Sequence, residues 1–472
     1  MARATPQRSD RVPPAGVAEP GFLTVLAIAL PVVLSNGAVP LQGAIDTAIM
    51  GNTGDTALLA AVALGAAAIG LLIGTLNFLH ASVSGTTAQA VGAARRERAV
   101  NTLIRGMALA LTLGLAIAAL RHPLAALLMH LFEGSARTEA ASASYLAIRL
   151  IGAPAELGSY VLMGWFSGQG RTRRLLEMQI AASLVNVVAT LTLVLGAGLG
   201  IEGLAVGTLI GQGTGFVYGL VRAAGTVRWL MPAGWRPDWV RVARREEIVA
   251  LLRLSRDFFL RTLLLAICFA WVARLGSLQG EAVLAANGVL LEFFLFTAAA
   301  LDGFAIAAEA LVGRAVGARS PRALRAAIRT VLAAAATIAL ALAAALAVAA
   351  PWIVALFTDL EDVRAVAGTY VLWAALLPLP GVAPFTLDGI FVGAADGRAM
   401  LRSMAVAAAA FLPLGWAATL VFGNHGLWAA FWALLILRAV ALALYLPALE
   451  ARVARGAEAG STSAPTASAS EA

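Results

Sequence analysis

Length, composition and charge place this chain of 472 residues in a lipid bilayer. Apolar residues make up 60% of the chain, charged residues only 13%, and the mean hydropathy is +0.85. A water-soluble chain carries charge on about a quarter of its residues, so the composition excludes a soluble protein. The net charge of +8 arises from arginines that cluster in short segments between apolar runs, a placement that argues against a nucleic-acid-binding patch.

The chain opens with a polar segment and continues into a long apolar run. Residues 1–20 lack the apolar core of a signal peptide, so we expect a cytosolic tail there. The run from Phe22 to Met50 is about 29 residues long, or roughly 43 Å as a helix, which is enough to cross a bilayer. Further spans are predicted at 57–84, 100–120, 142–166, 175–198, 204–229, 254–276, 282–312, 328–350, 366–393, 399–422 and 427–448. The sequence thus predicts an all-α integral membrane protein with twelve transmembrane helices.

The arginines are distributed unevenly between the two sets of loops. Those that follow the even-numbered spans are Arg95, Arg96, Arg98, Arg171, Arg173, Arg174, Arg236, Arg241, Arg244, Arg245, Arg314, Arg319, Arg322, Arg325, Arg398, Arg402, Arg452 and Arg455. The opposite side holds only Arg121, Arg137, Arg274 and Arg364. Positive charge marks the cytosolic side of a membrane protein. We therefore expect a multi-pass protein of the cell (inner) membrane with both termini in the cytosol.

The longest polar connection divides the spans into two groups of six. The expected units are an amino-terminal lobe at 21–229, a cytosolic linker at 230–250, a carboxy-terminal lobe at 251–450 and a disordered cytosolic tail at 451–472. The segment Ala90–Ala93 (AVGA) returns as Ala315–Ala318 at the same place in the second group. With six spans in each copy, the lobes would be related by a pseudo-twofold axis along the membrane normal, with the ligand path between them.

One acid, Asp46, lies near the end of the first apolar run. Ser35 and Gln42 lie within about 40° of its direction on a helix and form a polar stripe with it. Lipid cannot satisfy such a stripe, so it must face the interior of the bundle. An ionisable group inside a membrane is costly and is by default a functional candidate. Asp46 is therefore a candidate site for protons or cations, unless it caps the helix at the outer interface.

Neutral polar residues share helix faces in the fifth and sixth spans. Asn186 and Thr190 are four residues apart, and so are Thr208 and Gln212, so each pair lies on one face. Such residues hold helices together more often than they bind ligands. Both roles stay open for them on this pattern.

The second half contains further charged candidates inside its spans. They are Asp302, Glu309 and Glu292 in the eighth span, Asp388 in the tenth, and Arg261 in the seventh. Asp302 and Glu309 share a helix face. An ion pair between Arg256 or Arg261 and an acid of the eighth span would neutralise buried charge, which is the structural alternative to a binding site.

Sequence signals for catalysis or metal binding are missing. No CxxC pair, HExxH pair or phosphate-binding glycine loop occurs, and the only cysteine, Cys268, lies in an apolar run. A membrane-embedded enzyme would need a nucleophile or an acid–base group with a partner, and the sequence contains no His–acid or Cys–His constellation. We expect neither an enzyme nor a cofactor or metal.

Several segments together resemble one family of membrane transporters. Pro31–Gly51 (PVVLSNGAVPLQGAIDTAIMG) is similar to the first span of the multidrug and toxic compound extrusion (MATE) family. The segments that resemble its DinF branch are Arg256–Thr262, Val283–Asn287, Leu301–Ala305 with Ala308–Leu311, and Asp388–Gly393. The resemblance covers most of 21–450. It implies two six-helix lobes that form a V, alternating access, and export of cationic compounds against an inward flow of protons or sodium.

The resemblance also implies roles for single residues. The family's essential first-helix aspartate corresponds to Asp46, its fifth-helix asparagine to Asn186 and its sixth-helix threonine to Thr208. The family's fifth-helix aspartate falls on Thr190, so that acid is missing here. A hard cation prefers several oxygen ligands. The departure therefore favours protons over sodium as the coupling ion.

Taken together, the sequence predicts a secondary active exporter that exchanges small organic cations for protons. We expect it to act as a monomer in the bilayer and to bind no nucleic acid. A sodium-coupled exporter of the same family is one alternative, and a flippase for lipid-linked precursors is another. A flippase for anionic pyrophosphate lipids should line its cavity with arginines, whereas the arginines here lie mostly in the predicted cytosolic loops.

Overall fold

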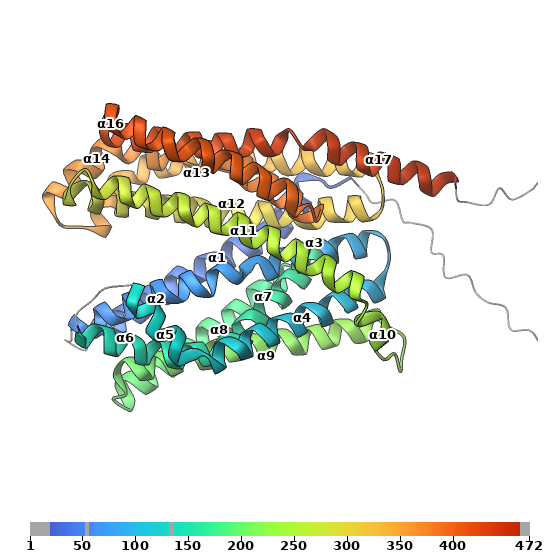
Figure 1. Cartoon of the computed structure of the whole chain (residues 1–472), viewed down its shortest axis with the longest axis horizontal. Coiled ribbons are helices and arrows are strands. Elements are labelled where there is room, and N and C mark those ends of the chain that lie inside the picture. The colour runs from blue at the N-terminus through green and yellow to red at the C-terminus, as the bar shows by residue number, and fades with distance from the viewer. Residues whose placement is uncertain (1–18, 52–55, 132–135, 463–472) are drawn as a thin grey trace, which may run out of the picture.

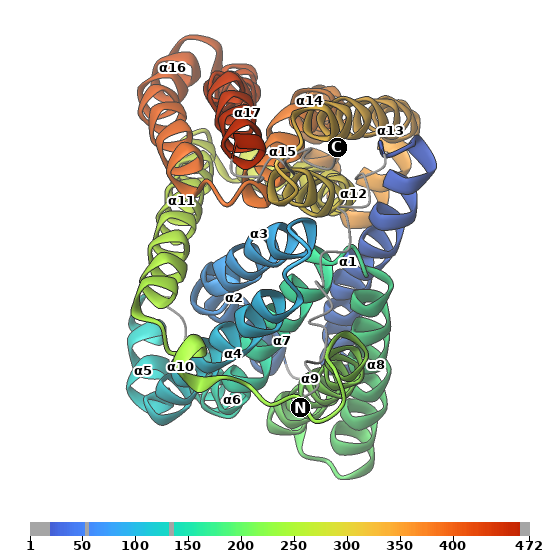
Figure 2. The ribbon, with the colours of Figure 1, turned by 90° about the vertical axis from the view of Figure 1, so that its right-hand side faces the viewer.

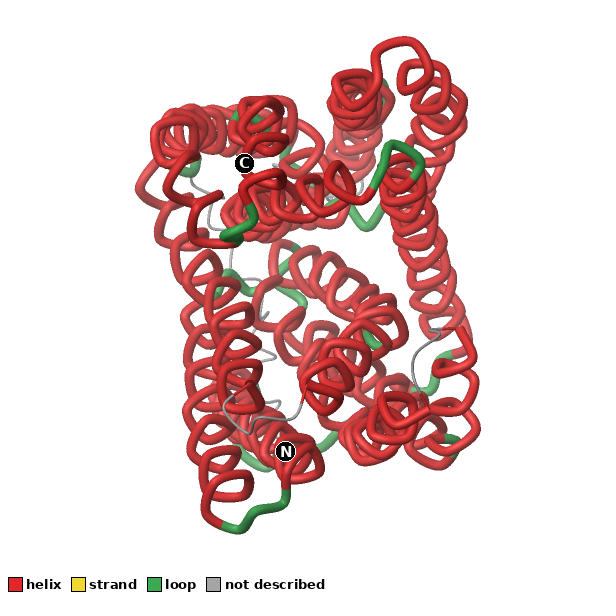
Figure 3. Tube along the Cα trace, turned by 90° about the vertical axis from the view of Figure 1, so that its left-hand side faces the viewer, coloured by secondary structure: helices red, strands yellow, loops and turns green. Residues whose placement is uncertain are grey.

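The computed structural model describes residues 19–51, 56–131 and 136–462, and nearly all of these residues are helical (Figure 3). Long apolar runs form helices in a bilayer because each backbone N–H and C=O must find its partner within the same segment. The first half contains α1 (Phe22–Gly51), α2 (Thr56–Leu72), a 3-10 turn η1 (Gly74–Asn77), α3 (Phe78–Gly92), α4 (Arg96–Ala119), α5 (Arg121–Leu131), α6 (Ala136–Arg149), η2 (Leu150–Gly152), α7 (Ala153–Gly168), α8 (Arg173–Leu191), a π-helical turn η3 (Thr192–Gly196) and α9 (Gly200–Leu230).

The second half begins with a short helix in the connection between the two groups of spans. Its elements are α10 (Trp239–Val242), α11 (Arg245–Ser277), α12 (Glu281–Gly317), α13 (Pro321–Phe357), α14 (Glu361–Ala375), α15 (Pro378–Gly393), α16 (Gly397–Ala443) and α17 (Leu446–Thr462).

The helical stretches account for the predicted spans. In the described residues, ten stretches are long and apolar enough to cross a membrane, or eleven when α14 and α15 count as one bent span. The last stretch, Gly397–Ala459, contains a reversal at Gly423, where φ is 57° and ψ is −137°. The part of α16 after Gly423 returns toward the middle of the lobe. Its Arg438 binds the carboxylate of Asp388, which also binds Arg261 in the middle of α11. Counted as two passes, this stretch agrees with the eleventh and twelfth predicted spans.

Several predicted spans are not single uninterrupted α-helices; η2 divides the span predicted at 142–166, and η3 ends the α-helix of the span predicted at 175–198. The span predicted at 57–84 consists of α2, η1 and α3 and continues to Gly92. The span predicted at 366–393 bends by 45° between α14 and α15. Pro378 opens α15 there, and a proline nitrogen cannot donate to the preceding turn.

Two stretches predicted to be irregular are helical. α11 begins at Arg245, inside the connection predicted at 230–250. α17 continues to Thr462, so the prediction of disorder from residue 451 onward is wrong for 451–462. Leu449 and Val453 are buried against the carboxy-terminal lobe, and this burial orders a segment rich in helix-forming Ala, Glu and Arg. Residues 1–18 and 463–472 of the predicted tails lie outside the described residues.

The helices form two lobes, as predicted (Figures 1 and 2). The amino-terminal lobe contains α1–α9, with Trp165 and Phe166 fully buried in its core. The carboxy-terminal lobe contains α11–α17, with Phe293, Phe411 and Phe431 in its core. α1 and α11, the first helix of each copy, lie on opposite sides of the molecule and each packs against the other lobe (Figure 2).

Contacts between the lobes repeat with a fixed offset. Ser84 donates a hydrogen bond to Glu309, and these two residues are 225 positions apart. Gly92 packs against the backbone of Arg314, and Gly317 packs in the same way against Gln89, so that a Cβ on either glycine would lie 2.0 Å from a carbonyl oxygen of the other lobe. Reciprocal contacts of this kind define a pseudo-twofold axis that passes near Ser84 and Glu309.

The arginine-rich loops gather at one end of the molecule, which we call the basic end (right-hand side of Figure 1). The lobes are joined there: Arg314 binds the carbonyl of Gln169, and Gln89 donates to the carbonyl of Gly393 at 3.1 Å. One buried apolar cluster near this end combines the start of α1 with α11, α12, α13 and α15. At the opposite end, by contrast, the buried clusters of the described residues each belong to one lobe.

Candidate functional site

The polar stripe of α1 faces its neighbours inside the amino-terminal lobe. Asp46 lies within α1 rather than beyond its end, is half-buried, and has a buried Oδ1 atom without a hydrogen-bond partner among the described residues. One turn earlier, Gln42 accepts a hydrogen bond from the Ser183 hydroxyl of α8 at 3.2 Å. Ser35 is buried on the same helix. The stripe therefore connects α1 to α8, in the half of the lobe remote from the basic end.

Three of the predicted neutral residues are brought together because α8 and α9 pack closely. Asn186 donates to the Thr208 hydroxyl at 3.1 Å, and both Asn186 and Thr190 are 0% exposed. Gly207 and Gly211 allow this approach, since a Cβ on Gly207 would lie 2.4 Å from the Thr190 hydroxyl oxygen. Within residues 19–51, 56–131 and 136–462, the Asn186 Oδ1 and Thr190 Oγ1 atoms have no hydrogen-bond partner. α8 therefore carries two such unpaired oxygens, and the adjacent α1 carries a third, the Oδ1 atom of Asp46.

An arginine that the sequence reasoning missed completes this group. Arg149, at the end of α6, is buried and donates to Gln212 of α9 at 2.6 Å. It lies 4.0 Å from the carboxylate of Glu156 on α7, and it is within range of charge–charge interaction with Asp46. An arginine inside an apolar run is the signal that could have identified it.

The carboxy-terminal lobe holds a second group of charges, which are buried or partly buried. Asp388 of α15 is bound by Arg261 of α11 and by Arg438 beyond the Gly423 reversal, the latter at 2.8 Å. The structural pairing considered for Arg261 therefore exists, but its partner is Asp388 rather than an acid of the eighth span. Arg256, also considered for that pairing, binds the adjacent Asp257 at 2.8 Å.

Two of the eighth-span acids extend this group toward the interface between the lobes. Asp302 is within charge–charge range of Arg261 and Asp388, and Glu309 is within range of Asp302. Glu309 is buried and accepts the hydrogen bond of Ser84 from the other lobe. Glu292 lies on the same helix, but no hydrogen bond or ion pair among the described residues involves it.

Each lobe thus combines carboxylates with guanidinium groups that are buried or partly buried. In the described residues, no three His, Cys, Asp or Glu side chains are grouped as metal ligands. The chemistry available to these groups is the exchange of protons and the binding of ions.

A known protein family matches this chain twice, once in each half. The sequence pattern of the MatE family matches residues 31–192 and again 256–417, which is the same 225-residue offset that relates Ser84 to Glu309. The chain belongs to the MatE family. Members of this family are membrane transporters and not enzymes, so the fold predicted from the sequence and the predicted absence of an enzymatic role are both confirmed.

Individual relatives agree with this assignment. The chain is 37% identical over 420 residues to DNA damage-inducible protein F of Escherichia coli (strain K12), covering 88% of this chain and 90% of the relative, which supports the DinF branch. It is 25% identical to Protein DETOXIFICATION 44, chloroplastic, of Arabidopsis thaliana, over 92% and 83% of the two chains. A solved MOP superfamily transporter from Pyrococcus furiosus Vc1 shares the fold, with a TM-score of 0.80 at 20% identity over 93% of this chain and 97% of that chain.

Proposed function

We propose that this MatE transporter exports small organic cations in exchange for protons, with Asp46 as the coupling group. The observation that carries the proposal is the Asp46 carboxylate itself, whose Oδ1 atom is buried and has no hydrogen-bond partner in the part of the chain that the structure describes. A buried oxygen in that condition gains a partner when it binds a proton, an ion or a cationic substrate. Asn186, Thr190, Thr208, Gln42 and Ser35 complete the proposed site.

The balance of charge supports a cationic substrate. In the amino-terminal lobe, Asp46 and Glu156 oppose a single guanidinium, that of Arg149. In the carboxy-terminal lobe, Asp388, Asp302 and Glu309 oppose Arg261 and Arg438. Each group therefore carries a formal excess of one carboxylate when its acids are ionised. That excess attracts a cation and disappears when one carboxylate takes up a proton.

The same charge balance argues against a flippase for anionic lipids. Arg149 and Arg438, which are buried, and Arg261, which is partly buried, each lie beside a carboxylate. Paired in this way, they do not present the unopposed positive surface that a pyrophosphate group requires.

The choice of ion depends on Thr190. With a hydroxyl at this position, Asp46 is the only acid among the residues proposed for the amino-terminal site, and one carboxylate suits a proton. A specific observation favours sodium as the second candidate: Asp46 Oδ1, Asn186 Oδ1 and Thr190 Oγ1 are all unpaired oxygens on two adjacent helices. Oxygens without hydrogen-bond partners are the ligands that a hard cation uses.

Alternating access follows from the way the lobes pack. They are joined at the basic end by Ser84, Glu309 and the Gly92 and Gly317 contacts. With the basic end in the cytosol, this arrangement is closed to the cytosol, and Asp46 lies in the half nearer the outside. Protonation of Asp46 from outside removes its charge and releases the cation in that direction. We place the protein in the cell (inner) membrane with both termini in the cytosol. The proposed lobes are residues 21–229 and 251–450, and the protein acts as a monomer.

The test is efflux of a cationic dye from proteoliposomes under separately imposed gradients. We expect an inwardly directed proton gradient to drive efflux in the absence of sodium. A sodium gradient at uniform pH should then give the rate of protein-free liposomes. Efflux that is driven by sodium and unaffected by pH would show that sodium, the second candidate, is the coupling ion. Absence of efflux under both gradients would contradict the proposed function.

A further inference from the structure

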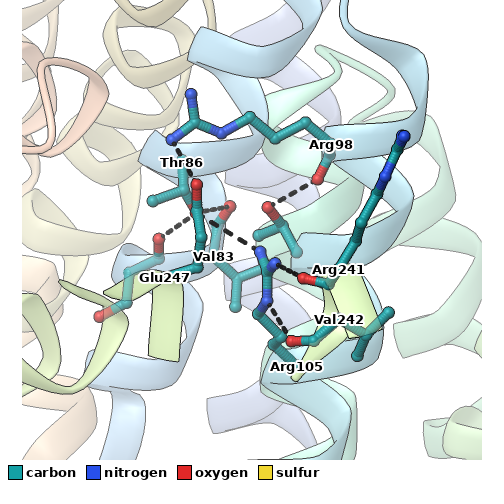
Figure 4. A network of polar contacts seen from close by, with 9 residues as sticks. Val83, Thr86, Arg98, Arg105, Arg241, Val242 and Glu247 are labelled. Atoms are coloured by element: carbon teal, nitrogen blue, oxygen red, sulfur yellow. Dashed lines mark hydrogen bonds and ion pairs between the residues drawn. The ribbon is translucent and has the colours of Figure 1, made fainter. Parts of the chain in front are cut away.

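A cavity at the basic end lies outside the proposed transport site. It has a volume of about 420 Å³, which is within the usual range for a ligand pocket. Its lining residues are Arg95, Arg96, Glu97, Arg98, Asn101, Arg105, Arg241, Arg244 and Glu247. They come from the start of α4, from α10 and from the start of α11, so the cavity lies where the amino-terminal lobe meets the connection to the second lobe (Figure 4).

The cavity carries a large excess of positive charge. Its two acids are already paired: Glu97 binds Arg241 at 3.0 Å, and Glu247 lies 3.5 Å from both Arg98 and Arg105. The other arginines, Arg95, Arg96 and Arg244, have no ion-pair partner among the described residues.

Arg105 fixes one wall of this cavity. Its side chain is only 8% exposed, and it donates to the backbone oxygens of Arg241 at 2.6 Å and Val242 at 2.8 Å (Figure 4). These bonds hold α10 against α4. Arg95, Arg96 and Arg244 therefore surround a cavity whose wall is held in place by hydrogen bonds.

Backbone and amide groups add to the site. α4 and α11 both begin at the cavity, and the residues that precede them, Arg95 and Arg244, do not cap them with a side-chain hydrogen bond. Helix N-termini in that condition present N–H groups to anions. Asn101 lines the cavity at 5% exposure, and its buried Oδ1 atom has no hydrogen-bond partner among the residues described. A ligand that carries both a phosphate and a hydroxyl would bond to the arginines and to this amide.

The surroundings of the cavity place it at the membrane surface. Trp239 and Val240 of α10 are 66% and 80% exposed, while Val242 of the same helix is buried. An exposed Trp beside an exposed aliphatic residue at the end of the spans is typical of the interface between water and lipid. α10 therefore positions the cavity at the depth of the lipid headgroups.

We propose that this cavity binds the phosphate headgroup of an anionic phospholipid, such as phosphatidylglycerol. Basic pockets between membrane helices are suited to such headgroups, because guanidinium groups bind phosphate in bidentate geometry. A headgroup held by Arg96 of α4 and Arg244 at the start of α11 would also brace the arrangement in which the lobes are joined. This inference does not depend on the transported substrate or on the coupling ion.

The test compares lipid retention by native mass spectrometry of the detergent-solubilised full chain, supplied with equal amounts of phosphatidylglycerol and phosphatidylcholine. We expect the natural protein to retain phosphatidylglycerol selectively. The double variant Arg96→Gln/Arg244→Gln should lose roughly 30-fold in that preference, because each arginine near an anionic group contributes about a factor of five. Neither residue takes part in an ion pair among the described residues, so the hydrogen bonds from Arg105 to the backbone of Arg241 and Val242 should stay intact.

Two controls separate the site from general electrostatics. Arg398→Gln/Arg402→Gln removes two exposed arginines at the same end of the molecule, outside the cavity, and should leave the preference unchanged. Arg96→Lys/Arg244→Lys should restore most of it. Equal losses in the cavity variant and the Arg398/Arg402 control would overturn the proposal. Stoichiometric binding of inorganic pyrophosphate that displaces phosphatidylglycerol at equal concentration would overturn the choice of a lipid in favour of a soluble phosphate compound.

Discussion

At the residue scale, Thr190 decides how many carboxylates the amino-terminal site holds. It is fully buried against Gly207, and its hydroxyl oxygen has no hydrogen-bond partner. Aspartate is close to threonine in volume, so the position can accept an acid. Two carboxylates in one buried site repel each other unless a cation or a proton lies between them.

Thr190→Asp is therefore expected to raise the affinity for sodium at least tenfold, which corresponds to about 1.4 kcal/mol. Sodium binding by the purified protein, measured by calorimetry at a pH where carboxylates are ionised, checks this. Thr190→Asn is the matched control, because it adds the same volume without charge and should bind sodium like the natural protein. Equal affinities for all three proteins would show that position 190 does not contribute to an ion site.

Asp388 is expected to serve stability rather than coupling, because two guanidinium groups already bind it. Asp388→Asn would leave the charges of Arg261 and Arg438 without their partner inside the bundle. Breaking a buried pair in this way costs about 3–5 kcal/mol, so the midpoint of thermal unfolding should fall. Asp359→Asn removes an exposed acid that is paired with Arg364 at 2.7 Å and should leave the midpoint nearly unchanged. An Asp388→Asn protein as stable as the natural one, yet unable to pump, would assign Asp388 to coupling instead.

At the scale of the helices, hydropathy largely predicted where each helix lies in the sequence. It did not predict which side chains of different helices contact one another. Runs of apolar residues indicate where helices form, since a bilayer permits little else. The rotation of each helix about its axis depends on packing. That is why the pairing of Arg261 with Asp388, and the position of Arg149 beside Asp46, required the three-dimensional structure. Bends such as the one before Pro378 and the reversal at Gly423 also divide the spans in ways that hydropathy does not show.

The contact between α3 and α12 leads to a prediction about closure of the basic end. A Cβ on Gly92 would lie 2.0 Å from the carbonyl oxygen of Arg314, which is backbone and cannot move aside alone. Gly92→Ala should therefore separate the lobes at this end, at a cost of about 1–3 kcal/mol for overpacking. A cysteine at Ser82, which is fully buried and bonded to Ser255 across the interface, reports the separation through faster maleimide labelling.

Gly70→Ala is the control for that experiment, because nothing lies within 4 Å of a Cβ at Gly70. It should leave the labelling rate at Ser82→Cys unchanged. Equal rates in the Gly92→Ala and Gly70→Ala proteins would show that the tight contact does not hold the lobes together. Both experiments use a Cys268→Ser background, so that the natural cysteine does not react.

At the scale of the whole molecule, the arginine distribution and the fold point to one orientation. Ala233, in the connection before α10, and Ser277, at the end of α11, are exposed at opposite ends. In the Cys268→Ser background, an impermeant maleimide added to intact cells should label Ser277→Cys and leave Ala233→Cys unlabelled. The reverse pattern would place the basic end outside and contradict the proposed topology.

Efflux by the Asp46→Asn variant tests most directly whether a proton on Asp46 drives export. Asparagine keeps the size of the side chain but cannot bind or release a proton. Under an inward proton gradient, proteoliposomes with the natural protein or with the Asp359→Asn control should expel a cationic dye. Those with folded Asp46→Asn should expel it no faster than protein-free liposomes. Proton-driven efflux by Asp46→Asn at the natural rate would contradict the account.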